Sequence, residues 1–308
     1  MVSIRVLRAL SPADLAAVRT FLDAAHVLDC AQLNDHLRAD LRHGPRPGFL
    51  AALATTGDDE LIGYAQASAG NDGFVVDAIV WSSFDGDTDL ASAALLHRLL
   101  GELPDDAAVT WWTHDGDSAR DLAASLGMQP GRSLLQMRRD LPIDTDTGRD
   151  AGTAVAVRGF RVGADEEAWL EVNNAAFAWH GEQGGWDLAT LHQREQEPWF
   201  RAEGFLLHER DGRLAAFCWT KLHAPDTPDG ALVGEIYVIA VHPQFHGLGL
   251  GRALTVAGLR SLHAAGATEG MLYVDATNTS AVRLYDQLGF EVAHTDQSYV
   301  RPTGGSSQ

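Results

Sequence analysis

One stretch of the chain, residues 234–252, constrains the fold more than any other. It begins with a run of β-forming residues, 236–241, and turns at His242 and Pro243. Three glycines follow at every second position, and an Ala- and Leu-rich helical pattern begins directly after them. A strand, a glycine loop and a helix N-terminus in this order bring backbone N–H groups and partial positive charge close to a ligand. The stretch therefore predicts an α/β fold with a phosphate-binding loop.

The composition is that of a globular protein with an acidic excess. Of its 308 residues 45% are hydrophobic, and 23 basic against 42 acidic residues give a net charge of −19. This charge argues against nucleic-acid and anionic-membrane partners, although backbone amides can still hold a polyanion locally. No apolar run approaches the ~20 residues that span a membrane, and no secretion signal is recognisable. With Cys30 and Cys218 as its only cysteines, the chain is expected to be cytoplasmic.

The chain is also a duplicated α/β unit, because Gly127 placed over Gly289 brings the two halves into the same order of patterns. Each half has an early helix, a β run, a second helix, a further β run and a last helix. The aligned pairs are 11–26 with 163–177, 74–81 with 235–242, 90–100 with 252–265, 108–113 with 271–274, and 117–128 with 279–290. Ser11 or Asp14, and Asp165, are the predicted N-terminal caps of the early helices.

The division between the halves is expected in a polar, aperiodic linker, residues 143–155. We therefore expect an N-terminal domain over 1–145, a C-terminal catalytic domain over 154–301 and a disordered tail over 302–308. The glycine loop of the second half aligns with residues 85–90 of the first, which contain three aspartates and one glycine. Carboxylates there would repel a pyrophosphate, so the cofactor loop of the first domain is expected to be degenerate.

Residues 246–251, HGLGLG, resemble the [Q/R]-x-x-G-x-[G/A] signature with which GNAT N-acetyltransferases hold acyl-CoA, with His246 in place of Gln or Arg. A second family block, LYVDATNTSAVRLYDQLGF, follows at 272–290. The resemblance implies an α/β fold with a mixed, α+β-type sheet in two tandem GNAT domains. It also implies acetyl-CoA as co-substrate and no metal, and the thirteen histidines form no HxH or HExxH pair. The implied acetyl-CoA contacts are Ile239, Ala240, Val241, His246, Gly247, Leu248, Gly249, Leu250, Gly251, Arg252, Asn278 and Arg283.

Acetyl transfer from a thioester to an amine needs a base for the amine, donors for the oxyanion and an acid for the thiolate. Glu235, before the glycine loop, is the implied base, and its alternative is an exposed carboxylate at a strand edge. Tyr285 is the implied acid, and its alternative is a tyrosine of the core. Strand residues 239–241 are implied to supply backbone hydrogen bonds, because the GNAT sheet splays there. In the first half, Glu235 aligns with Phe74 and Tyr285 aligns with Ala123. Neither of these two residues can act as an acid or a base.

Nearly the whole chain resembles one branch of tandem GNAT enzymes, the mycothiol synthase family. The resemblance extends to NNAAFAWHGEQGGWD at residues 173–187 and to the end of the first half. In that family the acceptor is the cysteinyl amine of a cysteine–glucosamine–inositol conjugate, desacetylmycothiol, and its acetylation completes mycothiol. A polyhydroxylated acceptor needs several carboxylate, ammonium and phenol hydrogen bonds. The implied acceptor contacts are Asp35, Glu182, Lys221, Glu235 and Tyr273.

Two other functions remain open. GNAT cofactor motifs say little about the acceptor, so an N-acetyltransferase of another small-molecule or peptide amine is one alternative. A non-catalytic acyl-CoA-binding regulator is the other, and the presence of Glu235 and Tyr285 in the half that has the glycines argues against it. A nucleotide-binding oxidoreductase is disfavoured, because GxGxxG with an acidic partner is absent. Two domains in one chain make a monomer the expected state.

Overall fold

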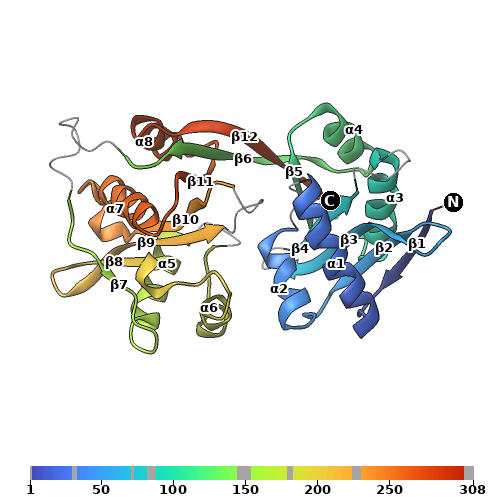
Figure 1. The fold of residues 1–308 in the computed structure, drawn as a ribbon, viewed down its shortest axis with the longest axis horizontal. Coiled ribbons are helices and arrows are strands. Elements are labelled where there is room, and N and C mark those ends of the chain that lie inside the picture. The colour runs from blue at the N-terminus through green and yellow to red at the C-terminus, as the bar shows by residue number, and fades with distance from the viewer. Residues whose placement is uncertain are drawn as a thin grey trace, which may run out of the picture. The chain divides into compact units, whose positions relative to one another are not determined.

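The chain folds into two compact units, each of which is a sheet with helices packed on both faces (Figure 1). The computed structural model describes residues 2–29, 33–70, 73–81, 88–143, 154–178, 183–223 and 230–301. Unit 1 comprises residues 1–134 and 295–308, and unit 2 comprises residues 135–294. Parallel and antiparallel strand pairs occur in both units, which confirms the mixed α/β fold expected from the sequence.

Unit 1 is built on a mixed sheet with the strand order β1-β2-β3-β4-β5-β12. Its helices are α1 (Pro12–Asp29), α2 (Asp35–His43), α3 (Thr88–Leu100) and α4 (Asp117–Ser125). Its strands are β1 (Ser3–Leu7), β2 (Leu50–Thr55), β3 (Leu61–Gly70), β4 (Gly73–Val80), β5 (Val109–His114) and the second half of β12 (Glu291–Arg301). β4 and β5 are parallel, and the other pairs are antiparallel.

Unit 2 repeats this plan with the strand order β6-β11-β10-β9-β8-β7. Its helices are α5 (Glu166–Ala176), α6 (Leu188–Glu195), α7 (Leu250–Ala264) and α8 (Thr279–Gln287), with 3₁₀ turns η1 (Ala202–Gly204) and η2 (Pro243–Phe245). Its strands are β6 (Gln129–Asp140), β7 (Arg158–Gly159), β8 (Phe205–Arg210), β9 (Arg213–His223), β10 (Val233–Val241) and β11 (Glu269–Asp275). β10 and β11 form the parallel pair that corresponds to β4 and β5.

The central strand β9 of unit 2 is apolar on both faces because helices cover both. Cys218 packs with Leu254 of α7 on one face. Trp219, the next residue, packs with Trp169 of α5 on the other face, with ring centroids 5.7 Å apart. Successive strand residues point to opposite faces, so a continuous apolar run is what a doubly covered strand requires. This rigid centre holds β10, the strand that carries the candidate site.

The two units end their last helices in the same way, which confirms the predicted alignment of Gly127 with Gly289. Both glycines adopt a positive φ, +70° and +81°. The residue after each glycine donates its N–H to the carbonyl of Ala123 in unit 1 (2.9 Å) and of Tyr285 in unit 2 (3.0 Å). A left-handed glycine with this hydrogen bond is a common way to end a helix. Ala123 and Tyr285 therefore occupy equivalent positions.

The register of the parallel strands confirms a second predicted equivalence. Phe74 of β4 lies opposite Val109 of β5, and Glu235 of β10 lies opposite Met271 of β11. Val109 and Met271 stand at the same distance before the two helix-ending glycines. Phe74 in unit 1 therefore occupies the place of Glu235 in unit 2.

The predicted N-cap residues lie at the starts of both early helices, but only one helix has a side-chain capping bond. Ser11 precedes α1, where Asp14 donates its N–H to Ser11 Oγ (3.1 Å) and Ser11 donates its own N–H to Asp14 Oδ2 (3.3 Å). Asp165 precedes α5, but its carboxylate makes no capping bond. It accepts instead from the guanidinium of Arg158 (2.6 and 2.9 Å) and from the N–H of Arg161 (2.7 Å). Asp165 therefore holds the predicted N-cap position, but the charge-assisted bonds to arginine replace the side-chain capping bond.

The boundaries between the two compact units do not lie in the polar linker. Residues 144–153, which contain most of that linker, lie outside the described residues, as does the expected disordered tail, 302–308. The units separate at 134–135 and at 294–295, because β6 and β12 each begin in one unit and end in the other. The boundaries of the two sequence repeats stay a prediction.

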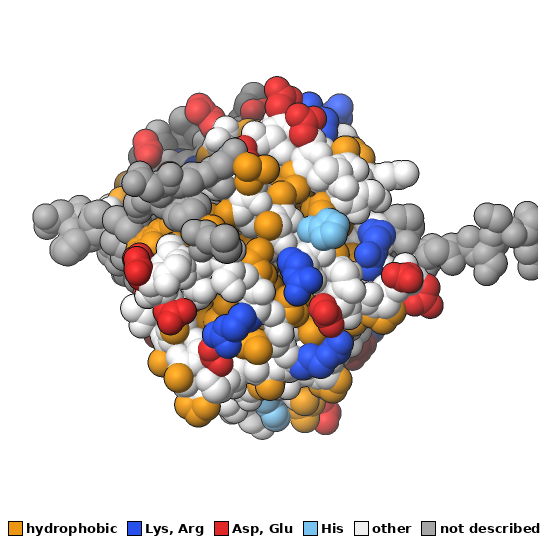
Figure 2. Space-filling view, turned by 90° about the vertical axis from the view of Figure 1, so that its right-hand side faces the viewer, with side chains coloured by type: hydrophobic (Ala, Val, Ile, Leu, Met, Phe, Trp, Pro, Cys, Tyr) orange, Lys and Arg blue, Asp and Glu red, His pale blue; other side chains and the backbone are white. Residues whose placement is uncertain are grey.

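Charged side chains of both signs are mixed on the face of unit 1 that Figure 2 shows. Arg side chains alternate there with Asp, Glu and hydrophobic side chains. Among the described residues of this face, such mixing provides no single-sign patch to attract a polyanion. Within the described residues, none of the helices has both the length and the apolar character needed to cross a bilayer.

Candidate active site

The sheet of unit 2 splays beside β10, at the place that the GNAT resemblance implies. β10 pairs with β9 to its end, but its parallel pairing with β11 stops at Ile236 although both strands continue. A register shift after Ile236 marks a bulge at Tyr237, and bulges turn a strand away from its neighbour. The implied contacts Ile239, Ala240 and Val241 follow the bulge. They therefore lie on a strand edge that the paired part of β11 does not cover.

The glycine loop joins this edge to α7. Gly247 and Gly249 have φ angles of +81° and +73°, which glycine adopts without strain, and Gly249 is the N-cap of α7. Gly251 differs in its backbone, because it lies in the first helical turn without a positive φ, and a Cβ added to any of the three glycines would meet nothing within 4 Å. The first helical hydrogen bond runs from Ala253 N–H to Gly249 O (3.2 Å), and amides before it lack helical partners. The loop thus presents amides and open space at the positive end of a helix dipole.

The side chains between the glycines have different environments. The exposed His246 donates Nε2–H to Val241 O at 3.0 Å, which leaves Nδ1 as an acceptor in the neutral ring. His246 would therefore donate a hydrogen bond to a phosphate only as an imidazolium. Leu250, the first residue of α7, is buried, whereas Leu248 is 48% exposed and Arg252 is half-buried. Their contacts with acetyl-CoA stay predictions.

Glu235 is a buried carboxylate on β10, one residue before the pairing with β11 ends. It is 6% exposed and lies opposite Lys221 of β9 and Met271 of β11. Its Oε2 lies 2.7 Å from Nε2 of His223. This burial rules out the alternative interpretation of Glu235 as an exposed carboxylate. A carboxylate withdrawn from water beside an uncovered strand edge is suited to accept a proton from a bound amine.

An aromatic wall holds the ammonium of Lys221 near Glu235. The Nζ atom lies 5.1 Å from the ring centroid of Trp199 and 5.5 Å from that of Tyr237. The two rings pack edge to face, with centroids 4.8 Å apart. Aromatic faces attract cations, so the rings fix a positive charge beside the carboxylate. Lys221 is therefore a half-buried residue of this site rather than a solvated surface lysine.

Tyr285 is a tyrosine of the core, and its role as the acid stays a prediction. It is 7% exposed on α8 and packs edge to face on Phe290, with centroids 5.8 Å apart. Burial, together with the neighbouring Cys218, raises the pKa of the Tyr285 hydroxyl. The phenol therefore keeps its proton at neutral pH, which is the state a general acid needs.

Asn278 and Arg283 of the second family block lie on α8, the first at its start and the second on its exposed side. Asn278 is the N-cap of α8, and its Oδ1 accepts the N–H of Ala281 at 3.2 Å, as predicted. Arg283 is exposed. A contact of either residue with acetyl-CoA stays a prediction.

The remaining implied acceptor contacts are described only in part. Tyr273 on β11 is 40% exposed, and its hydroxyl accepts a hydrogen bond from Nε2 of Gln136 at 2.7 Å. Glu182 lies outside the described residues, as does the side chain of Asp35 at the start of α2. The structure therefore places Lys221 opposite Glu235 on the neighbouring strand, and the roles of all these residues stay predictions.

In unit 1, a carboxylate of the protein lies at the corresponding splay. The pairing of β4 with β5 stops at Val76 although β4 continues. Asp77 follows, and its carboxylate accepts the N–H groups of Ala78 (2.8 Å) and Asn34 (3.4 Å). A backbone amide next to the splay is thus occupied by a side chain of the protein. Residues 85–87 of the predicted degenerate loop lie outside the described residues, and its last three residues form the start of α3.

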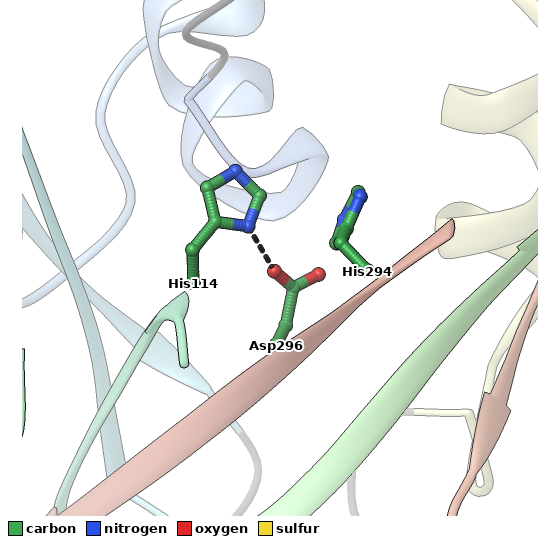
Figure 3. A group of neighbouring side chains, drawn as sticks. All are labelled: His114, His294 and Asp296. Carbon is green, nitrogen blue, oxygen red and sulfur yellow. Dashed lines mark hydrogen bonds and ion pairs between the residues drawn. The ribbon is translucent and has the colours of Figure 1, made fainter. Parts of the chain in front are cut away.

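A histidine–aspartate pair lies close to Asp77 in unit 1. Nδ1 of His114 on β5 lies 2.7 Å from Oδ1 of Asp296 on β12. Figure 3 shows this bond, with His294 two residues earlier on β12. The hydrogen bond to Asp296 raises the pKa of His114. Burial raises the pKa of Asp77 to about 7, and the charge of Asp296 adds to that effect.

Comparison with known proteins assigns the family. Residues 167–290 match the acetyltransferase (GNAT) family. A mycothiol acetyltransferase from Thermobispora bispora is 41% identical over 295 residues, which cover 94% of this chain and 97% of that protein. Another from Streptomyces avermitilis is 42% identical over 301 residues, covering 96% and 94%. The chain belongs to the mycothiol acetyltransferase family.

Solved structures agree with this family in fold. A tandem GNAT protein from the clavulanic acid biosynthesis pathway has a TM-score of 0.69 at 15% identity and covers 99% of this chain and 100% of its own. A GCN5-related N-acetyltransferase from Sphaerobacter thermophilus has a TM-score of 0.65 at 22% identity and covers 99% and 97%. Membership of the family makes the chain an N-acetyltransferase with acetyl-CoA as co-substrate, and the family indicates no metal cofactor.

Sequence reasoning missed two neighbours of the site. His223 stands two residues after Lys221 on β9, and the period of two in a strand puts both on one face, so this signal was available. Trp199 lies in an irregular segment before η1, where no periodicity predicts which side chain turns inward. Its place over Lys221 follows only from the tertiary fold.

Proposed function

We propose that this protein transfers acetyl from acetyl-CoA to the cysteinyl amine of desacetylmycothiol, the cysteine–glucosamine–inositol conjugate, in the last step of mycothiol biosynthesis. The observation that carries the proposal is the buried Glu235 beside the splayed edge of β10, in a chain about 40% identical to mycothiol acetyltransferases over nearly its full length. The acceptor is a small molecule, and the enzyme acts as a cytoplasmic monomer without nucleic-acid or membrane partners.

Glu235 and Tyr285 perform the proton transfers. An ammonium has no lone pair, so Glu235 first removes a proton from the acceptor nitrogen. The bound thioester supplies the acetyl group, and the nitrogen attacks its carbonyl carbon. Backbone N–H groups along residues 239–241 stabilise the oxyanion. Tyr285 donates its proton to the departing thiolate, and burial supports this role because it keeps the phenol protonated. After its attack the nitrogen still carries one proton too many. It loses that proton to the Tyr285 oxygen, which restores the phenol and leaves a neutral amide.

The remaining residues bind the two substrates. Amides of residues 247–251 hold the pyrophosphate of acetyl-CoA, and the first turn of α7 adds its partial positive charge. Lys221, fixed over its aromatic wall, and the exposed Tyr273 bind hydroxyl groups of the acceptor. Glu182 and Asp35 complete the acceptor contacts.

The test is mass spectrometry of a reaction that contains the protein, acetyl-CoA and desacetylmycothiol. Mass detection is required because the acceptor carries a thiol that reacts with thiol dyes. Glu235→Gln should lower kcat by about 10²–10⁴-fold, the usual contribution of a general base. Glu291→Gln is the matched control, because it makes the same change at an exposed glutamate at the start of β12. It should leave kcat unchanged. Bound acetyl-CoA without acetylated product would reject this acceptor and favour another amine or a non-catalytic role.

A further inference from the structure

The buried base has a more exposed partner. The side chain of Glu235 is 8% exposed, whereas that of His223, with Nε2 2.7 Å from Glu235 Oε2, is 22% exposed. The contact is diagonal across the β9–β10 pair, because His223 lies opposite Val233 and Glu235 lies opposite Lys221. His223 therefore links the buried carboxylate to the solvent-facing end of β9.

The proposed reaction creates a need at this point. After each acetyl transfer Glu235 carries the proton from the amine, and it must lose that proton before it can act again. Lys221, the other ionisable residue that faces it from β9, is an ammonium without an accepting lone pair. Met271, opposite Glu235 on β11, has no acid or base chemistry. An imidazole has both an acceptor and a donor nitrogen, so His223 can pass a proton on.

We propose that His223 is a positioning residue that also relays the proton of Glu235 to solvent, an inference that rests on the proposed function. The N–H bond of the acceptor breaks and an O–H bond forms on Glu235. For this step His223 is the neutral tautomer with its hydrogen on Nδ1, so that Nε2 accepts a hydrogen bond from the new O–H group. The O–H bond then breaks as an N–H bond forms at Nε2, and the hydrogen on Nδ1 leaves to water. One proton has moved from the amine to water, and the ring regains its starting tautomer by exchange with solvent.

Two substitutions separate the relay from the hydrogen bond. His223→Gln keeps an N–H donor near the position of Nε2 but cannot carry a proton, and His223→Ala removes both properties. Both variants should lower kcat by about 10²-fold, the low end for proton-transfer groups, with an unchanged KM for acetyl-CoA. Added imidazole should restore much of kcat in His223→Ala, because it fills the vacated space and accepts the proton. His97→Ala, at an exposed histidine on α3, is the matched control.

Three results would overturn the relay. The first is wild-type kcat in His223→Gln, and the second is a His223→Ala variant that imidazole does not rescue. The third comes from the double variant Glu235→Gln/His223→Ala: a relay that acts through Glu235 predicts no further loss beyond Glu235→Gln, whereas multiplied losses mean independent effects. A wild-type protein that makes no product overturns the proposed function and the relay together, so the two failures are distinguishable. Thermal unfolding of each variant identifies those that simply fail to fold.

Discussion

The two units share one frame but differ at the residues that would do chemistry. Both have a parallel strand pair that separates before its strands end, and both end the following helix with a left-handed glycine. Unit 2 has Glu235 where unit 1 has Phe74, and Tyr285 where unit 1 has Ala123. Unit 1 also places the carboxylate of Asp77 at its splay.

This difference shows that the frame and the chemistry are separable. The splay and the helix-ending glycine occur in both units, so they belong to the fold rather than to catalysis. The ionisable side chains and the glycine loop are what distinguish the unit with a candidate site. Substitutions at matched places in the two units therefore test which features serve folding and which serve the reaction.

After Glu235→Gln, the largest effect is expected at Tyr285, which stands where unit 1 has Ala123. Tyr285→Phe keeps the ring packed on Phe290 and removes the proposed acid, so kcat should fall by about 10²-fold with little change in the melting temperature. The matched control in unit 1 is Tyr299→Phe, which removes a hydroxyl from a ring that packs on Trp111. Steady-state kinetics should show no change in kcat for the control. Equal losses in both variants would mean that the hydroxyls serve stability.

A smaller effect is expected at a glycine that the fold does not require. Gly251→Ala adds a methyl group that meets no protein atom, so the helix should be as stable or slightly more stable. The methyl group would enter the space proposed for the pyrophosphate, and KM for acetyl-CoA should rise about tenfold, which corresponds to ~1.4 kcal/mol.

Another glycine of α7 provides the reciprocal control. A Cβ on Gly258 would lie 2.6 Å from both Cys218 Sγ and Ile236 Cδ1. Gly258→Ala should therefore destabilise the protein by about 1–3 kcal/mol through overpacking, with KM for acetyl-CoA unchanged. An unchanged KM in Gly251→Ala would place the cofactor elsewhere.

The smallest effects concern two aspartates, one in each unit, whose pKa values shift in opposite directions. Burial raises the pKa of Asp77 from 3.8 to about 7, so between those values the folded chain binds a proton that the unfolded chain does not. Stability from this group falls as the pH rises through that window. Asp77→Asn should therefore gain melting temperature relative to the wild type as the pH increases from 4 to 8.

Asp165 should behave in the opposite way. Burial would raise its pKa, but the hydrogen bonds from Arg158 and Arg161 lower it from 3.8 to about 2. Its stabilisation is present above pH 4 and is lost as the pH falls to about 2. Asp165→Asn should cost on the order of 1–2 kcal/mol at pH 7 after solvent screening, and nothing near pH 2. Thermal unfolding of both variants across this pH range measures the two opposite slopes, and parallel slopes would contradict the assignment.

The sequence predicted those features that depend on local backbone chemistry. Gly127 and Gly289 marked the repeat because each has a positive φ that few other residues tolerate. The helix predicted from Arg252 begins earlier, at Leu250, because Gly249 is its N-cap. The N-cap position of Asp165 was predicted correctly, but its lack of a capping hydrogen bond was not, because the competing Arg158 comes from a separate strand.

The neighbours of the base could be predicted only in part. His223 contacts Glu235 through the register of two strands, and strand register depends on the tertiary fold. The bulge at Tyr237 and the aromatic wall around Lys221 have the same origin. Predictions from one sequence therefore reach the loop and the base more easily than the side chains that surround the base.

The strand β12 begins in unit 2 and ends in unit 1, and this has a consequence for the newly made chain. Residues 296–301 complete the sheet of unit 1 by pairing with β5, yet the whole of unit 2 is synthesised between β5 and these residues. At the usual rates of synthesis, the strands of unit 1 must wait on the order of ten seconds for this edge partner. During that time β5 has an unsatisfied edge, which is the kind of surface that chaperones and neighbouring chains bind. The first half of the protein to be synthesised is thus the last to have its sheet closed.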